Sequence, residues 1–140
     1  MPELQGRCLC GQFSYEVNAS PLATMICHCK NCQRQGGAAF SLNVVVPADA
    51  VATKGELKVF HDKADSGNTV DREFCATCGS PIFSRLSANP GIAIIKAGTL
   101  DDTSSLTPGG EVWCDSAQSW MKPMIEGARF PNRLLCTSDA

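Results

Sequence analysis

The segment Cys27-His28-Cys29-Lys30-Asn31-Cys32 places three thiols in one short stretch, and the interpretation of the chain starts from it. Two further pairs lie on either side, in Cys8-Leu9-Cys10-Gly11 and in Cys75-Ala76-Thr77-Cys78-Gly79. Cys-x-x-Cys is the spacing at which one turn directs two sulfurs at a single tetrahedral zinc ion. In Cys-x-Cys the two side chains lie on one face of an extended chain. The glycine after the second cysteine suits a turn with positive φ. The three groups therefore predict zinc bound through cysteine thiolates.

Seven thiols do not divide into two closed sites, so the natural division is four plus three. A zinc ion with three protein ligands keeps one position for water or substrate. Cys27, Cys29 and Cys32 are contiguous and are favoured as this open set. The closed set would then consist of Cys8, Cys10, Cys75 and Cys78. One alternative is a zinc ribbon that joins Cys29 and Cys32 to the Cys75 and Cys78 pair. Another is a redox Cys-x-x-Cys, which expects a βαβ context that the sequence lacks.

The composition restricts the class of protein. The chain has 140 residues, the size of one domain, and 44% of them are apolar and 19% charged, as in a globular protein. Its nine cysteines are an odd number and cannot all pair within the chain. The formal charge of −2 argues against a nucleic-acid partner, and no apolar run is long enough for a membrane span. Because Met1–Arg7 lacks a secretory signal pattern, we expect a cytoplasmic protein, in a reducing compartment where clustered cysteines indicate metal or catalysis.

Short β-branched or aromatic runs between turn residues predict strands along most of the chain. Phe13, Tyr15 and Val17 alternate with polar residues, as in a half-buried strand. The other expected strands are Phe40–Val46, Glu56–Phe60, Val70–Phe74, Pro81–Phe83 and Ile92–Ala97, and Glu56–Phe74 as a whole is expected to form a hairpin. Short helical turns are expected at Cys29–Gln35 and Ser116–Met121. The chain is therefore predicted to be one mainly β domain.

A wider pattern surrounds the cysteines. It consists of Gly6–Gly11, Cys27–Arg34 with Gly37–Phe40, and Arg72–Pro81. In order and spacing these stretches resemble the glutathione-dependent formaldehyde-activating enzyme family, which also includes centromere protein V, and the resemblance extends to about Trp120. It implies a single domain over residues 1–140, built as a zinc-pinned β-tent of small antiparallel sheets with short helical turns.

The resemblance also implies two zinc ions per chain. Cys8, Cys10, Cys75 and Cys78 would hold a structural ion, and Cys27, Cys29 and Cys32 a catalytic one. The family's named reaction joins formaldehyde to the thiol of glutathione, giving S-hydroxymethylglutathione. The implied activity is that of a carbon–sulfur lyase-type enzyme acting on an adduct of glutathione, or a similar thiol, with formaldehyde or another small aldehyde. Glu111 departs from the family pattern, which has a histidine there, and Ser119 stands where a proline precedes the tryptophan.

Three thiolates outweigh the charge of a zinc ion, so the open ion is expected to be a poor Lewis acid for an aldehyde. It suits a soft thiolate as its fourth ligand, and a coordinating thiol is deprotonated at neutral pH. The hypothesis is therefore that the open position captures the substrate thiol. Because glutathione is anionic, Lys30 and Arg34 are the nearest candidate cations in the sequence, although ordinary solvated surface charges explain them equally well.

Other residues are first assigned to the structure of the chain. Alternation along the chain would turn the His28 ring away from the ion, which favours a structural or supporting role over ligation. The remaining assignments are His61 to the surface, Trp113 and Trp120 to the core, and Cys114 and Cys136 to buried or incidental thiols. Cys114 could still approach the open zinc as an internal fourth ligand.

Two functions other than catalysis stay open. One is a non-enzymatic binding module in which both zinc ions are structural and the β surface meets another protein. The other is a zinc or thiol buffer without a defined substrate. The sequence also leaves open whether the chain forms a homo-oligomer.

Overall fold

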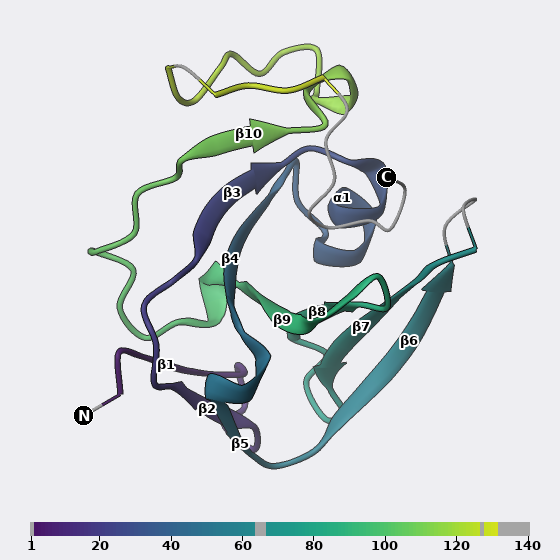
Figure 1. Ribbon diagram of the computed structural model, residues 1–140. Helices are drawn as coiled ribbons and strands as arrows, with labels where there is room; N and C mark the ends of the chain where they lie inside the picture. The colour runs from purple at the N-terminus through teal and green to yellow at the C-terminus, as the bar shows by residue number, and fades with distance from the viewer. Residues whose placement is uncertain (1, 64–66, 127, 132–140) are drawn as a thin grey trace.

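The computed structural model describes residues 2–63, 67–126 and 128–131. Its strands form two sheets (Figure 1). The smaller sheet has the order β1-β2-β5, from β1 (Leu4–Arg7), β2 (Ser14–Val17) and β5 (Val51–Lys54). The larger has the order β10-β3-β4-β9-β8-β7-β6. Its strands are β3 (Ala23–Cys27), β4 (Ser41–Pro47), β6 (Leu57–Lys63), β7 (Thr69–Cys75), β8 (Pro81–Leu86), β9 (Asn89–Lys96) and β10 (Gly110–Val112).

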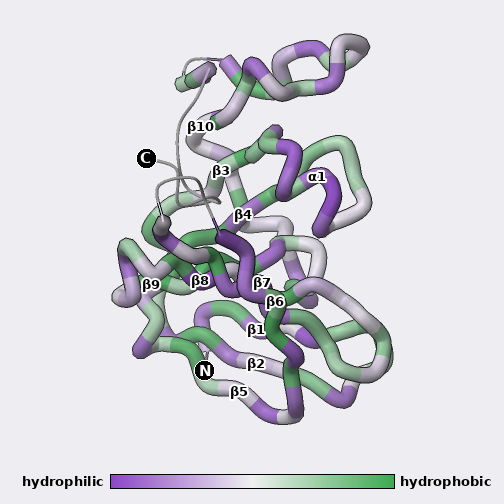
Figure 2. Tube along the Cα trace, turned by 90° about the vertical axis from the view of Figure 1, so that its right-hand side faces the viewer, coloured by the Kyte–Doolittle hydropathy of each residue, from purple (hydrophilic) through white to green (hydrophobic). Residues whose placement is uncertain are grey.

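The helical elements of the described residues are short. They are α1 (Lys30–Gly36) and the 3-10 turns η1 (Ala48–Ala50), η2 (Ala97–Thr99) and η3 (Cys114–Ser116). Figures 1 and 2 place α1 and β10 at one end of the molecule and the β1-β2-β5 sheet at the other. The expected mainly β class of small sheets with short helical turns is confirmed.

One strand pair departs from the expected antiparallel arrangement. β10 pairs in parallel with β3, with Glu111 opposite Ile26 and Val112 opposite Cys27. A parallel pair requires a long connection, since a tight hairpin can join only antiparallel strands. The chain supplies this connection by running through six intervening strands, β4 to β9, before it returns. The parallel pairing places Glu111 and Val112 beside the cysteine-rich segment.

The main core lies between the two sheets. β2 turns Tyr15 and Val17 inward, and they pack with Phe83 of β8 and with the apolar residues of β4 and β9 (hydrophobic stretches in Figure 2). The rings of Tyr15 and Phe83 meet edge to face with 5.2 Å between centroids. β1 approaches this core so closely that a Cβ at Gly6 would collide with the Tyr15 hydroxyl and the Thr99 carbonyl. A glycine is therefore required there for steric reasons.

Most expected strands are present with shifted ends. Phe13–Val17 corresponds to β2, Phe40–Val46 to β4 and Ile92–Ala97 to β9, while Glu56–Phe74 forms the β6–β7 hairpin and Pro81–Phe83 begins β8. The sequence interpretation missed β1, β3, β5 and β10. The helical turn expected at Ser116–Met121 is wrong, because the 3-10 turn η3 begins two residues earlier. Trp113 starts it in the left-handed region, at φ 56°.

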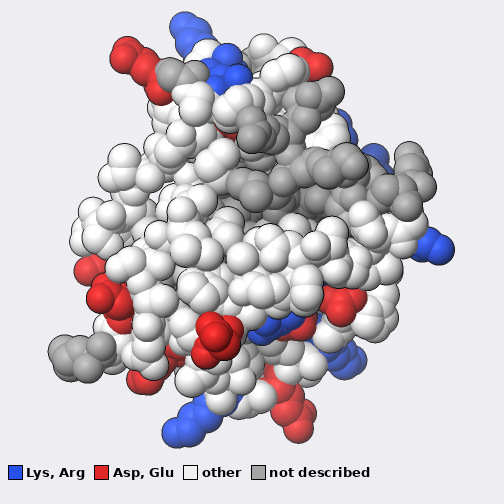
Figure 3. Space-filling model, viewed as in Figure 1, with Lys and Arg blue, Asp and Glu red and all other residues white. Residues whose placement is uncertain are grey.

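No helix in the described ranges is long and apolar enough to cross a membrane. On the face shown in Figure 3, the charged side chains lie mostly toward the edge of the molecule, with Lys and Arg interspersed with Asp and Glu.

Candidate metal centres

The first sulfur cluster joins the turn after β1 to the turn after β7. Cys8 and Cys10 follow β1, Cys75 ends β7, and Cys78 lies in the turn that leads to β8. Their four Sγ atoms lie within 4.8 Å of one another, with 3.6 Å between Cys8 and Cys10 and 3.8 Å between Cys10 and Cys75. Four thiols at this separation fit a closed tetrahedral zinc site, because zinc prefers soft thiolate donors in that geometry.

Backbone amides point at the sulfurs of this cluster. The Phe13 N–H donates to Cys8 Sγ at 3.4 Å. The N–H groups of Thr77 and Cys78 both donate to Cys75 Sγ at 3.3 Å. Hydrogen bonds of this kind stabilise a thiolate more than a neutral thiol, because they are charge-assisted. The turns are therefore shaped for the deprotonated form that binds metal.

The glycines after the paired cysteines behave as the sequence predicts. Gly11 has φ 82° and Gly79 has φ 80°, a region that other residues rarely adopt. The next residue, Ser80, hydrogen-bonds to Cys78 through its hydroxyl at 3.2 Å and thereby lowers the pKa of Cys78 to about 5. The turn that carries Cys75 and Cys78 thus favours thiolates, because the pKa values of both thiols are lowered there.

The second sulfur cluster is built at the junction of β3 and α1. Cys27 is the last residue of β3, Cys29 caps the N-terminus of α1, and Cys32 lies in its first turn. The Sγ atoms lie within 4.8 Å of one another, and all three side chains are buried. The Cys32 N–H donates to Cys29 Sγ at 3.3 Å, so the same sulfur that caps the helix belongs to the cluster. A three-thiol set of this kind fits zinc with one position left for a further ligand.

The structure brings the sulfurs together in the four-plus-three division. Cys29 and Cys32 lie with Cys27, so the alternative ribbon that joins them to Cys75 and Cys78 is wrong. The sulfur of Cys27 is in a disulfide in this structure. Since a metal ligand must be a thiolate, the complete three-sulfur set is available to metal in the reduced protein.

Two buried cations beside the second cluster were missed by the sequence interpretation. Lys96, at the end of β9, places its Nζ 3.9 Å from Cys32 Sγ, and Arg72 of β7 is 1% exposed. A hydrogen bond with Cys29 lowers the pKa of Cys32 to about 6, and the charges of Lys96 and Arg72 add to this effect against that of burial. For Lys96, the sequence feature that could have indicated a buried cation is its position directly after the apolar stretch Ile92–Ile95.

The cations proposed from sequence, Lys30 and Arg34, are exposed on α1. They line a shallow groove of about 440 Å³ together with Gln33, Gln118 and Trp120. Trp120 is 72% exposed, so its expected place in the core is wrong. The groove runs along the helix that carries Cys29 and Cys32 at its N-terminal end, and it presents two positive charges and an aromatic face to solvent.

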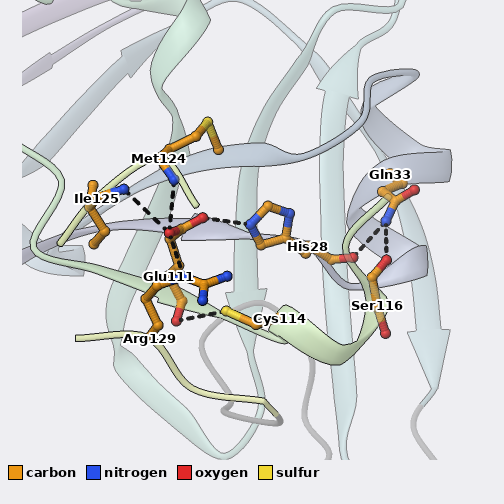
Figure 4. Close-up of polar contacts among 8 residues, drawn as sticks. All are labelled: His28, Gln33, Glu111, Cys114, Ser116, Met124, Ile125 and Arg129. Atoms are coloured by element: carbon orange, nitrogen blue, oxygen red, sulfur yellow. Dashed lines mark hydrogen bonds and ion pairs between the residues drawn. The ribbon is translucent and has the colours of Figure 1, made fainter. Parts of the chain in front are cut away.

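The His28 ring points at Glu111 and lies outside the cluster of three sulfurs (Figure 4). Its Nε2 lies 2.9 Å from Glu111 Oε1, and both side chains are fully buried. The second oxygen, Oε2, accepts from Arg129 Nε at 2.9 Å and from the backbone N–H groups of Met124 and Ile125. Burial raises the pKa of the Glu111 carboxyl, but the hydrogen bonds from His28 and Arg129 outweigh it, so the net shift is downward. Glu111 therefore holds Met124, Ile125 and Arg129 against β10.

The other residues considered from sequence take structural positions. The Cys114 thiol donates to the Glu111 carbonyl at 3.6 Å and is not part of either sulfur cluster. His61 is exposed and pairs with Asp71 at 2.6 Å, which confirms a surface histidine. Trp113 is half-buried and packs against the second cluster. Cys136 lies outside the described residues.

The chain is mainly β and carries two converging sets of cysteine sulfurs, a donor chemistry that could hold metal ions. A family model described as glutathione-dependent formaldehyde-activating enzyme matches residues 3–116, and the chain belongs to this family.

Two individual comparisons stand beside the family match, one for the sequence and one for the fold. A Penicillium rubens protein, whose name proposes glutathione-dependent formaldehyde activation, is 34% identical over 85 residues. The match covers 57% of this chain and 42% of that protein, so this chain spans less than half of the relative's length. A crystal structure of a Rhodobacter sphaeroides protein is similar with a TM-score of 0.55 at 21% identity, covering 74% of this chain and 91% of that one. The second comparison supports the fold.

Proposed function

We propose that the chain is a zinc-dependent carbon–sulfur lyase-type enzyme that acts on the glutathione adduct of formaldehyde or of another small aldehyde. In this proposal Cys8, Cys10, Cys75 and Cys78 hold a structural zinc ion. Cys27, Cys29 and Cys32 hold a catalytic one. The observation that carries the proposal is the second cluster, in which three buried sulfurs converge within 4.8 Å at the start of α1.

The two clusters suit different roles. The first has four donors, two from each of two turns that lie far apart in sequence, and it ties these turns together. The second has three donors from one continuous segment and cross-links nothing distant. A metal that serves only stability gains most from the first arrangement, because it closes a long loop. The second arrangement is better explained by a ligand exchanged at the fourth position.

When bound at the second cluster, a zinc ion would hold the substrate sulfur as a thiolate at neutral pH. The chain's own residues account for the rest. Burial of Cys27, Cys29 and Cys32 keeps water from the ligands, and a reducing cytoplasm would keep the Cys27 sulfur available. In this proposal Lys30 and Arg34, which line the groove along α1, bind the carboxylates of glutathione.

The reaction itself is an addition and its reverse. In the forward direction the sulfur attacks the aldehyde carbon, the S–C bond forms, the carbonyl double bond becomes a single bond, and the oxygen takes up a proton. The lyase direction breaks the S–C bond and returns the proton. Because this reaction also proceeds without a catalyst, the test must measure acceleration over the uncatalysed rate.

Exchange spectroscopy provides that test. The rate at which S-hydroxymethylglutathione interconverts with formaldehyde and glutathione is measured by NMR for the zinc-loaded, reduced protein and for Cys29→Ser. We expect acceleration by the native protein and at least about a hundredfold loss in the variant, since a ligand change removes the site. Cys114→Ser is the matched control, because Cys114 is a thiol outside both clusters. Equal rates with and without protein would refute the enzymatic proposal.

A further inference from the structure

Lys96 is a buried cation whose ammonium group faces the second sulfur cluster. The residue is 7% exposed. Its Nζ donates to Ser41 Oγ at 2.9 Å and to Asn43 Oδ1 at 3.3 Å, and it lies 3.9 Å from Cys32 Sγ. A lysine ammonium has three N–H donors. The three contacts therefore use all of them, and one is directed at a sulfur of the cluster.

The surroundings of Lys96 fix this orientation. Asn43 is its direct partner in the β4–β9 register, and Ser41 lies two positions earlier on the same face of β4. The Ser41 hydroxyl also donates to Asn43 Oδ1 at 2.6 Å, so the two oxygen acceptors are linked to each other. All three side chains are buried. A long and otherwise flexible side chain is thus held in one direction by two buried polar contacts.

Burial lowers the pKa of Lys96, and the charge of Cys32 acts against this shift. The ammonium form therefore needs a negative partner, because burying an unpaired charge is costly. The second buried cation, Arg72, already forms an ion pair with Asp62 at 3.0 Å. Within the described part of the chain, Lys96 forms no ion pair with a carboxylate. The anion that remains within reach is the Cys32 thiolate. Lys96 therefore faces the Cys32 sulfur as one of two cations, with Arg72 the other, that attract a thiolate there.

We propose that Lys96 is a positioning residue that donates an N–H···S hydrogen bond to the metal-bound Cys32 thiolate and so makes this sulfur a weaker nucleophile. Nucleophilicity resides in the thiolate lone pairs, and a charge-assisted hydrogen bond stabilises them. An aldehyde is then attacked by the added substrate thiol and not by the protein's own ligand. The inference rests on the proposed function, because it assumes an open thiolate-ligated metal site that meets electrophiles.

Site-resolved alkylation tests the inference. Zinc-loaded, reduced protein is treated with iodoacetamide, which forms an S–C bond to a cysteine while the C–I bond breaks and iodide leaves. Alkylation rates at Cys32 and Cys75 are measured by peptide mass spectrometry for the native chain, Lys96→Met and Lys96→Gln. Cys75 is the internal reference, since it is a buried member of the other cluster. We expect the ratio of the Cys32 rate to the Cys75 rate to rise about tenfold in Lys96→Met, the size that loss of a hydrogen bond to a charged group allows, and by less in Lys96→Gln, whose neutral amide keeps an N–H donor.

Two further variants separate charge from structure. Lys96→Arg keeps a cation with N–H donors and is expected to return the ratio toward the native value. Lys30→Met removes an exposed lysine from the same neighbourhood and is expected to leave the ratio unchanged. An increase of equal size at Cys32 and Cys75 would mean that the variants only loosen the fold, and it would overturn the inference, as would an unchanged ratio.

The zinc content of the native protein distinguishes the two levels of failure. Two ions per chain with no selective effect of Lys96 would reject the inference and leave the proposed function standing. One ion per chain, bound by the first cluster, would reject both, because Cys32 would then carry no metal.

Discussion

The cations around the second cluster differ in exposure, and exposure separates their roles. Lys30 and Arg34 were found from sequence because they flank Cys32, and the structure places them in a solvent-exposed groove. Lys96 lies 64 residues from Cys32 and could not be found that way. Its contact depends on the β4–β9 register and on how α1 docks, and neither follows from local pattern.

The exposed pair leads to a prediction about substrate charge. Replacing both residues, as Lys30→Gln with Arg34→Gln, should weaken glutathione binding by about fivefold to tenfold, because two charge-assisted contacts to carboxylates are lost in a partly screened position. Binding of the neutral thiol 2-mercaptoethanol should change by less than about twofold. Calorimetric titration of the zinc-loaded protein measures both. Lys58→Gln, an exposed lysine on β6, is the control. Equal losses of binding affinity for both thiols would show that the groove does not recognise the negative charge of glutathione.

A second prediction at the scale of a single residue concerns Glu111 and the pH dependence of the free energy of unfolding. The pKa of Glu111 is lowered in the folded protein, so the carboxylate form contributes stability above its unfolded pKa of about 4.3, and this contribution is lost as pH falls through the folded pKa. At pH 7, Glu111→Gln should reduce the free energy of unfolding by roughly 1–3 kcal/mol, since buried donors from His28 and Arg129 lose a charged acceptor.

The difference between native protein and Glu111→Gln should therefore stay constant from pH 7 to about pH 5 and shrink as pH falls below about 4.3. Acid also releases metal from thiolates, but it does so in both proteins, and the comparison isolates Glu111. Denaturant titration at several pH values provides the measurement. A difference that also stays constant below about pH 4.3 would contradict a charged Glu111 in the folded state.

Among the elements, the strands that were predicted are those with a clear local pattern, and those that were missed lack one. β2 alternates apolar and polar residues, and the β6–β7 hairpin is bounded by turn residues. β1 (Leu-Gln-Gly-Arg) contains a glycine at its centre, and β3 has no clean alternation because it lies inside the larger sheet, between β10 and β4. Central strands and glycine-containing strands are recognised from the strands that pair with them in the sheet, and this pairing is not evident from the sequence.

The glycine of β1 can be tested at the scale of this element. Gly6→Ala should destabilise the fold by about 1–3 kcal/mol, because the added methyl group would overlap the Tyr15 hydroxyl and the Thr99 carbonyl. Gly98→Ala is the matched control, since nothing lies within 4 Å of its Cβ position, and it should be close to neutral. Both are measured by denaturant unfolding with metal present. A neutral Gly6→Ala would mean that β1 is not seated on the core as described.

At the scale of the whole molecule, the proposed function assigns stability to the first cluster and chemistry to the second. The first cluster connects turns that lie 65 residues apart at Cys10 and Cys75, while the second lies within one segment. The spacing of the cysteines was sufficient to favour this division from sequence, because each motif is local. The parallel β3–β10 pair, which brings Glu111 to His28, could not be predicted from the cysteine spacing, because the pair joins the two ends of a long connection.

This division predicts unequal effects of ligand loss on stability. Cys10→Ser should lower the thermal midpoint by on the order of 10 °C or more, because it opens the metal link between distant turns. Cys29→Ser should lower it by only a few degrees. Removing metal from the native protein with a chelator should reproduce the larger effect. Differential scanning calorimetry of the reduced proteins is the measurement, and a larger loss for Cys29→Ser would reverse the assigned roles of the two clusters.

The central claim is an open thiol-capturing metal site beside a closed structural one, and a native mass spectrum with and without glutathione tests it most directly. The account predicts two zinc ions per chain and a glutathione adduct that is lost in Cys29→Ser and retained in Cys114→Ser. Two ions without an adduct would contradict thiol capture and favour a binding module with both ions structural. A single ion would contradict the four-plus-three assignment itself.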